Sequence, residues 1–144
     1  MALPKPEPGL VIPYAYLWRH EHRKGQEEGR KIRPVVIVLA SSIQPDGAIR
    51  VTVAPITHTP PGKMGKAIVL PPRVKTALAL DDDPSWIVLD EVNQFKWPGY
   101  DIRPVPGTPD RFFYGFIPPR LFDAVIARII ALAAERRTVQ ISRD

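Results

Sequence analysis

Residues 34–53 read PVVIVLASSIQPDGAIRVTV. The run Val35-Val36-Ile37-Val38 consists of β-branched residues, which favour a strand buried in a core. Pro45-Asp46-Gly47 predicts a turn, because proline presets one φ angle and glycine tolerates positive φ. From Ile49 to Val53 apolar residues alternate with polar ones, which predicts a half-buried strand. The whole stretch therefore predicts an antiparallel hairpin.

Shorter elements are expected on both sides of this hairpin. Further strands are predicted at residues 9–18, 66–70, 86–92 and 111–117, and a short helix is predicted at residues 71–80. Pro13 indicates that the first strand lies at a sheet edge or contains a bulge, because proline cannot donate a ladder hydrogen bond.

The segment that begins at Pro119 has a helical pattern. Its large apolar residues fall on one half of a helical wheel: Leu121, Phe122, Val125, Ile126, Ile129, Ile130 and Leu132. This predicts one amphipathic helix that packs on the sheet. Strands come first and the helix last, so the expected fold class is α+β, a compact β-barrel-like domain with a C-terminal helix. No linker interrupts the chain, which predicts a single domain over residues 1–144.

Composition excludes several classes of protein. The 144 residues include 18 prolines yet are 44% hydrophobic, which excludes both a bundle of long helices and a disordered Pro-rich linker. No cysteine is present, which excludes disulfides, thiolate nucleophiles and Cys-based zinc sites. No apolar run approaches the ~20 residues that span a bilayer, and no signal peptide is recognisable. A soluble cytoplasmic protein is expected.

Positive charge gathers in one loop. The net charge is +5, and residues 18–33 hold six of the basic side chains against three acidic ones. Such a loop suits an anionic partner, for example a nucleic-acid backbone. A solvated surface loop with no partner is the alternative.

The three histidines lie in two loops, His20 and His22 before the strong strand and His58 after its partner. The start of one hairpin strand meets the end of the other, so Arg33 is expected near Thr57 and His58. Such a set can act on a phosphodiester, because arginine balances charge on the phosphorane and imidazole moves a proton near neutral pH. Alternatively, Arg33 and Thr57 only hydrogen-bond the sheet edge. No carboxylate cluster completes a metal site with His20 and His22, so no metal is expected.

Three segments, in order along the chain, carry a family likeness. They are Gly25-Gln26-Glu27-Glu28-Gly29 with Arg33-Pro34-Val35-Val36-Ile37-Val38, then Val53-Ala54-Pro55-Ile56-Thr57-His58-Thr59, then Leu89-Asp90-Glu91-Val92. Together they resemble the MazF/PemK toxins of type II toxin–antitoxin systems. The resemblance implies an SH3-like barrel that dimerises, is neutralised by an antitoxin, and cleaves single-stranded RNA without metal or cofactor. In that reaction the 2′-hydroxyl attacks the adjacent phosphate and leaves a cyclic phosphate and a 5′-hydroxyl.

The resemblance also implies site residues. By position, Arg33 and Thr57 match the active-site arginine and threonine, and Asp90 matches a proposed acid/base residue. Val88 stands where some members have a catalytic arginine, and His58 is the candidate to take over that role. The candidate RNA-binding residues are Arg23, Lys24, Arg30, Lys31 and Lys63. The sequence also departs from the family in the longer spacing between residues 29 and 33, and in Glu91, which replaces a glutamine.

Two other functions stay open at the level of sequence. A toxin like CcdB, which has a related fold, would bind DNA gyrase without catalysis. A small RNA-binding barrel would stack bases on Trp18, Phe95 and Trp97, although aromatic residues so spaced are more often part of a core. Retention of Arg33 and Thr57 favours the nuclease.

Overall fold

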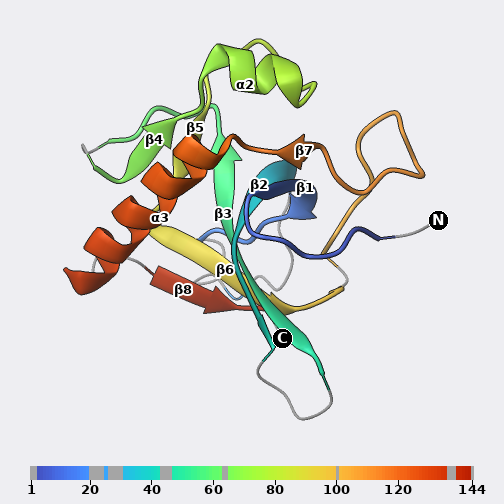
Figure 1. Cartoon of the computed structure of the whole chain (residues 1–144), viewed down its shortest axis with the longest axis horizontal. Coiled ribbons are helices and arrows are strands. Elements are labelled where there is room, and N and C mark those ends of the chain that lie inside the picture. Colours follow the sequence, from blue (N-terminus) through green and yellow to red (C-terminus); the bar gives the residue numbers. More distant parts are fainter. Residues whose placement is uncertain are drawn as a thin grey trace.

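The structure is a computed structural model that describes residues 3–19, 25, 31–42, 47–62, 65–99, 101–135 and 139–143. Its elements in chain order are β1 (Leu10–Ala15), β2 (Ile32–Ser42), β3 (Ile49–Thr57), β4 (Ala67–Val69), α2 (Pro72–Ala77), β5 (Trp86–Val88), β6 (Glu91–Lys96), β7 (Gly115–Phe116), α3 (Pro119–Ala134) and β8 (Val139–Ser142). The mostly antiparallel strands curl into a half-barrel, and α3 lies against it (Figure 1). The predicted α+β fold, a small barrel with a C-terminal helix, is confirmed.

The hairpin of β2 and β3 is the centre of the sheet. The two strands pair antiparallel from Val35–Pro55 to Ser42–Ile49, with a register shift between Ile37 and Leu39. Such an irregularity bends a strand and increases its twist. Along β3 the neighbour changes: β6 pairs with residues 50–53, and β5 pairs with residues 56–57. The sheet therefore curls along β3, and Thr57 lies at the end of β3 that pairs with β5.

The core lies on both faces of this hairpin. Val36 and Val38 belong to one apolar cluster, whereas Val35 and Ile37 belong to the other. Successive strand residues point to opposite faces, so a continuous apolar run fits a strand that is covered on both sides. The first cluster also contains Val125 and Leu132 of α3 and is therefore the one that the helix covers.

Pro13 predicted a sheet edge or a bulge, and the structure has neither, since β1 has a neighbour on both sides and its register with β2 is continuous. β1 pairs with β2 on one side and with β7 on the other, and Pro13 lies opposite Pro34. Hydrogen-bonded antiparallel pairs exchange two N–H···O bonds, so two facing prolines must occupy a non-hydrogen-bonded position. The β1–β2 ladder therefore tolerates both prolines away from a sheet edge.

Three further predictions are corrected by long-range pairing. The strand expected at residues 86–92 divides into β5 and β6, because the two parts have different partners. β5 pairs with β4 and with residues 56–57 of β3, whereas β6 pairs with residues 50–53 of β3. The strand expected at 111–117 shortens to β7. The helix is not the last element, since β8 follows it and pairs parallel to β6.

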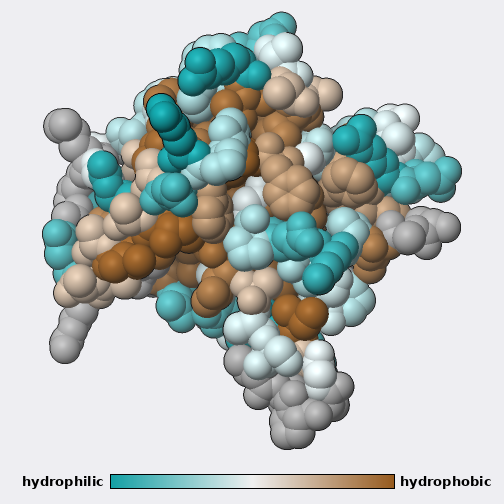
Figure 2. Space-filling view, viewed as in Figure 1, coloured by the Kyte–Doolittle hydropathy of each residue, from teal (hydrophilic) through white to brown (hydrophobic). Residues whose placement is uncertain are grey.

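The apolar face of α3 is narrower than the helical wheel predicts. Val125 and Leu132 are buried, but Ile130 is 64% exposed. Apolar side chains gather over α3 in the space-filling view (Figure 2). No helix among the described residues is long and apolar enough to cross a membrane.

Candidate active site

Two neighbouring cavities meet where β2 begins and β3 ends. The first, of about 380 Å³, includes Trp18, Val88 and Asp90 in its lining. The second, of about 500 Å³, includes His58 and Asp81. Arg33 and Thr57 line both cavities, so they stand at the junction of the two. The hairpin thus places Arg33 beside Thr57, with a separate hollow on either side.

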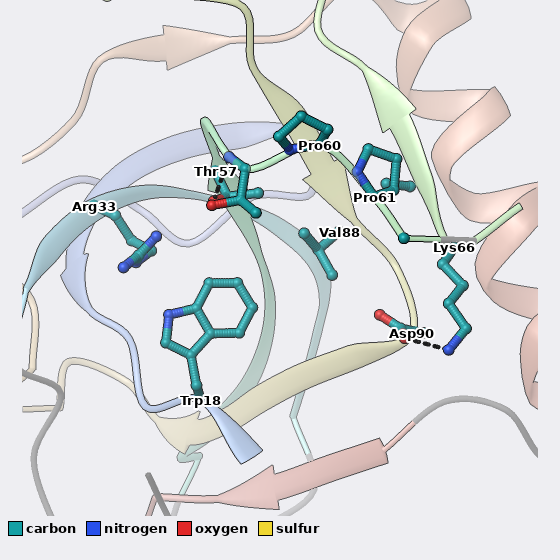
Figure 3. A pocket seen from close by; sticks show the side chains of 11 residues that line it. Trp18, Arg33, Thr57, Pro60, Pro61, Lys66, Val88 and Asp90 are labelled. Atoms are coloured by element: carbon teal, nitrogen blue, oxygen red, sulfur yellow. Dashed lines mark hydrogen bonds and ion pairs between the residues drawn. The ribbon is translucent and has the colours of Figure 1, made fainter. Parts of the chain in front are cut away.

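Arg33 lies over an aromatic ring. Its guanidinium carbon is 4.9 Å from the centroid of the Trp18 ring, a cation–π geometry. The rings of Tyr16 and Trp18 pack edge to face, with their centroids 5.0 Å apart. In the close view of the first cavity, Arg33 and Trp18 lie together on one side, below Thr57 (Figure 3). The indole ring therefore restricts where the guanidinium can point.

Strand β6 holds the Trp18 segment in place. Asn93, which is fully buried, accepts a hydrogen bond from the Leu17 N–H at 3.0 Å and donates one to the Leu17 carbonyl at 2.9 Å. Glu91 accepts from the Tyr16 hydroxyl at 3.1 Å and from the Arg19 N–H at 3.0 Å. Burial, together with the Glu91 charge, raises the pKa of Tyr16 well above its usual value, so the phenol stays protonated and donates. The Glu91 carboxylate thus holds in place the segment that carries Trp18, the ring over which Arg33 lies.

Thr57 ends β3 with its side chain toward the first cavity (Figure 3). Its Oγ1 accepts a hydrogen bond from the Thr59 N–H at 3.2 Å, a local turn that orients the hydroxyl. A hydroxyl that accepts one hydrogen bond can still donate one. Thr57 is therefore suited to donate to an oxygen of a bound anion.

Asp90 lies across the first cavity from Arg33 (Figure 3). Its carboxylate is 3.4 Å from the ammonium of Lys66, and both side chains are less than one-third exposed. Val88 forms an apolar wall between this ion pair and Thr57 (Figure 3). The first cavity thus combines a guanidinium, a hydroxyl, an ammonium and a carboxylate around an apolar surface.

His58 lines the second cavity, whereas Asp90 lines the first. The imidazole Nε2 is 2.8 Å from Oδ2 of Asp81, and both side chains are about half exposed. A hydrogen bond from Lys75, whose ammonium is 2.6 Å from Asp81 Oδ1, lowers the pKa of Asp81 below its usual value. The ionised carboxylate of Asp81 therefore orients the imidazole of His58.

One group among the described residues has a spacing that would suit a metal ion: His58, Asp81 and Asp83. The ammonium of Lys75 already bonds the Asp81 carboxylate and the Asp83 carbonyl, as well as Ser85 Oγ at 2.7 Å. The Lys75 ammonium thus already supplies a positive charge to this cluster, and we assign no metal ion to it.

Several predicted residues are placed differently or lie outside the described residues. The predicted RNA-binding residues Arg23, Lys24, Arg30 and Lys63, and the pair His20 and His22, lie outside them. Lys31 is exposed and lines the second cavity. Phe95 is only 2% exposed and stacks between Tyr14 and Trp97, so it is unavailable to a base; of the three aromatic residues considered, Trp18 lines the site.

Two charged residues of the site, Lys66 and Asp81, were not predicted from the sequence. No role was assigned to either of them from the sequence. Neither has a local signal, because Lys66 meets Asp90 through the pairing of β4 with β5, and Asp81 meets His58 and Lys75 across a loop.

Comparison with protein families gives one match. The family described as "PemK-like, MazF-like toxin of type II toxin-antitoxin system" matches residues 16–100, which is more than half of the chain. Comparisons with curated proteins and with solved structures gave no match. The matched residues contain Arg33, Thr57, His58 and Asp90, and the family implies an antitoxin as partner. With its half-barrel and its paired cavities, the chain belongs to the PemK-like, MazF-like toxins of type II toxin–antitoxin systems.

Proposed function

We propose that the protein is a metal-independent, sequence-selective endoribonuclease that cleaves single-stranded RNA through the RNA's own 2′-hydroxyl. One observation carries the proposal: Arg33 and Thr57 stand between two cavities, with a carboxylate lining one and an imidazole lining the other. Family membership supports it, because toxins of this family are in general ribonucleases.

The junction residues suit a phosphate. The planar guanidinium of Arg33 can donate two parallel hydrogen bonds to non-bridging oxygens, and its position over Trp18 reduces the reorganisation this needs. Thr57 adds a neutral donor beside it. Fixed donors aimed at developing negative charge are commonly the largest single contribution to catalysis.

The two cavities suit the two proton transfers of this reaction, one from the 2′-hydroxyl and one to the 5′-oxygen. In-line displacement at phosphorus places the attacking 2′-oxygen and the leaving 5′-oxygen on opposite sides. Asp90, in the first cavity, accepts the 2′-hydroxyl proton while the bond from the 2′-oxygen to phosphorus forms. His58, in the second cavity, donates a proton to the 5′-oxygen as its bond to phosphorus breaks. The products are a 2′,3′-cyclic phosphate and a 5′-hydroxyl.

The same family relation supports a cytoplasmic homodimer that an antitoxin inhibits. The RNA backbone would approach along the basic loop of residues 18–33. Lys31 belongs to this loop, is exposed and lines the second cavity.

The function is tested with a single-stranded RNA in EDTA and with the same RNA carrying a 2′-deoxy sugar at the cut position. We expect cleavage of the first to cyclic-phosphate ends, and binding of the second without cleavage. A requirement for a divalent metal would overturn metal independence. Binding of the all-ribose RNA without cleavage would replace the nuclease with an RNA-binding barrel, and neither binding nor cleavage would favour a gyrase-type inhibitor.

The role of His58 has a chemical test. His58→Ala should reduce the single-turnover cleavage rate by about 10²–10⁴-fold, the range typical of a lost general acid. An RNA whose 5′-bridging oxygen at the cut site is replaced by sulfur should largely restore the rate, because a thiolate leaves without a proton. The matched control is Asp90→Asn, which the sulfur substrate should not restore. Full activity of His58→Ala on ordinary RNA would remove His58 from the mechanism.

A further inference from the structure

The first cavity contains a cation for which the mechanism above has no use. Lys66 lines it across from Arg33, and its ammonium is 3.4 Å from the Asp90 carboxylate, on the side of that carboxylate away from Arg33 (Figure 3). Its side chain is 31% exposed, so this is not a lysine extended into solvent. The ammonium is thus held by Asp90 at the border of the cavity in which the substrate phosphate of the proposed reaction would bind.

The backbone of Lys66 is fixed by the sheet. The Leu89 N–H donates to the Lys66 carbonyl at 2.8 Å, and the next residue, Ala67, pairs with Val88. Lys66 is the residue just before β4 and lies beside the apolar wall that Val88 forms, whereas Arg33 belongs to β2. Two cations from separate segments of the chain therefore line one cavity.

We infer that Lys66 is a further catalytic residue, a second phosphate-binding cation that contacts the scissile phosphate from the side opposite Arg33; this inference rests on the proposed nuclease function. The phosphorane carries more negative charge than the ground-state diester, so a second cation stabilises the transition state more than the bound substrate. An ammonium on a flexible stem can follow a phosphorus centre as its geometry changes. Val88, Pro60 and Pro61 give part of the cavity an apolar lining.

The ion pair also connects the cation to the proposed base. Before RNA binds, Lys66 and Asp90 neutralise each other. A phosphate offers the ammonium a second anion, and movement of Lys66 toward it exposes the Asp90 carboxylate to the 2′-hydroxyl. Lys66 thus exchanges one anionic partner for another as the substrate enters, and Asp90 becomes able to accept a proton.

The test compares Lys66→Met with Lys66→Arg and with the control Lys96→Met. Lys96 is an exposed lysine of β6 that lies opposite Arg50, near the far end of β3 from Thr57, so its loss changes the net charge equally without touching the cavity. Three quantities are measured: the single-turnover cleavage rate, the Kd for the uncleavable 2′-deoxy RNA, and the urea midpoint. For Lys66→Met we expect a rate about 10²–10³-fold lower, the size of effect seen when one charge-stabilising donor is removed. The Kd should rise far less, Lys66→Arg should recover part of the rate, and Lys96→Met should behave as wild type.

Each alternative role of Lys66 predicts a different result. A cleavage rate for Lys66→Met within twofold of wild type overturns the inference, and it leaves the proposed function standing as long as the wild-type protein cleaves. A loss confined to Kd shows a cation that only attracts RNA and also overturns the inference. A rate loss accompanied by an equal loss for Lys66→Arg and a lowered urea midpoint shows a structural ion pair, which overturns it too. If wild-type protein cleaves no RNA, the proposed function itself has failed.

Discussion

Replacing Arg33 with alanine should reduce the rate of RNA cleavage by about 10³-fold, the lower range observed for arginines that stabilise phosphoryl-transfer transition states. Among the described residues, three polar side chains line both cavities: Arg33, Thr57 and Thr59. Arg33 is the one of the three that carries a charge. Alanine would leave the phosphate with no guanidinium at the point where charge develops. The fold should persist, because Arg33 lies near the start of β2 and outside both apolar clusters.

The lysine variant separates charge from geometry. Arg33→Lys keeps the positive charge but loses the planar pair of donors and the stacking on Trp18, so it should recover only a small part of the rate. The matched control is Arg73→Ala, an exposed arginine on α2 that lines neither cavity. Single-turnover cleavage of one RNA measures all three variants. An Arg33→Ala protein that cleaves within threefold of wild type would contradict the assignment.

Replacing Arg143 with methionine should cost about 3–5 kcal/mol of unfolding free energy, the range for a buried ion pair that loses one partner. Arg143 donates from Nη2 to Asp101 Oδ2 at 2.9 Å, and the two side chains are only 5% and 4% exposed. Burial, followed by the Asp101 charge, raises the pKa of the neighbouring Tyr14. The carboxylate of Asp101 would therefore remain in a site that disfavours an uncompensated charge.

A double variant distinguishes this explanation from a simple loss of packing. In Asp101→Leu combined with Arg143→Met, both charges are absent, and apolar replacements of buried ion pairs are often tolerated. We expect the double variant to be more stable than Arg143→Met alone, as measured by urea unfolding. A double variant whose loss equals the sum of the single losses would exclude an uncompensated charge as the cause.

The Arg143 prediction also concerns the site. β8 pairs parallel to β6, and the Arg143 N–H donates to the Gln94 carbonyl at 2.7 Å. β6 in turn carries Glu91 and Asn93, which hold the segment that leads to Trp18. Residues 139–143, which follow α3, thus stabilise β6, and β6 holds the segment that leads to Trp18, the ring beneath Arg33.

Much of the fold follows from local pattern. The β-branched run of β2, the alternation in β3 and the apolar stripe of α3 were each sufficient to predict an element. The alternation predicted a half-buried β3, and that part is wrong, because residues 51–56 are buried on both faces. The hairpin also predicted that Arg33 and Thr57 meet, since the start of one strand adjoins the end of the other. These parts depend on residues close together in sequence.

Other parts depended on segments that are far apart in sequence. The division of residues 86–92 into β5 and β6 reflects two different partners, and β8 has only four residues, too few for a periodic signal. The ion pairs Lys66–Asp90 and His58–Asp81 join residues that no local period relates.

The sequence by itself therefore determined the family, the α+β class, the central hairpin and the junction residues Arg33 and Thr57. Only the tertiary structure decided that His58 and Asp90 line different cavities, that Lys66 forms an ion pair with Asp90, and that β8 pairs with β6. The physical reason is that the pattern of apolar and polar side chains along the sequence indicates which residues are buried. Which charges face each other is set by strand pairing and loop closure over the whole chain.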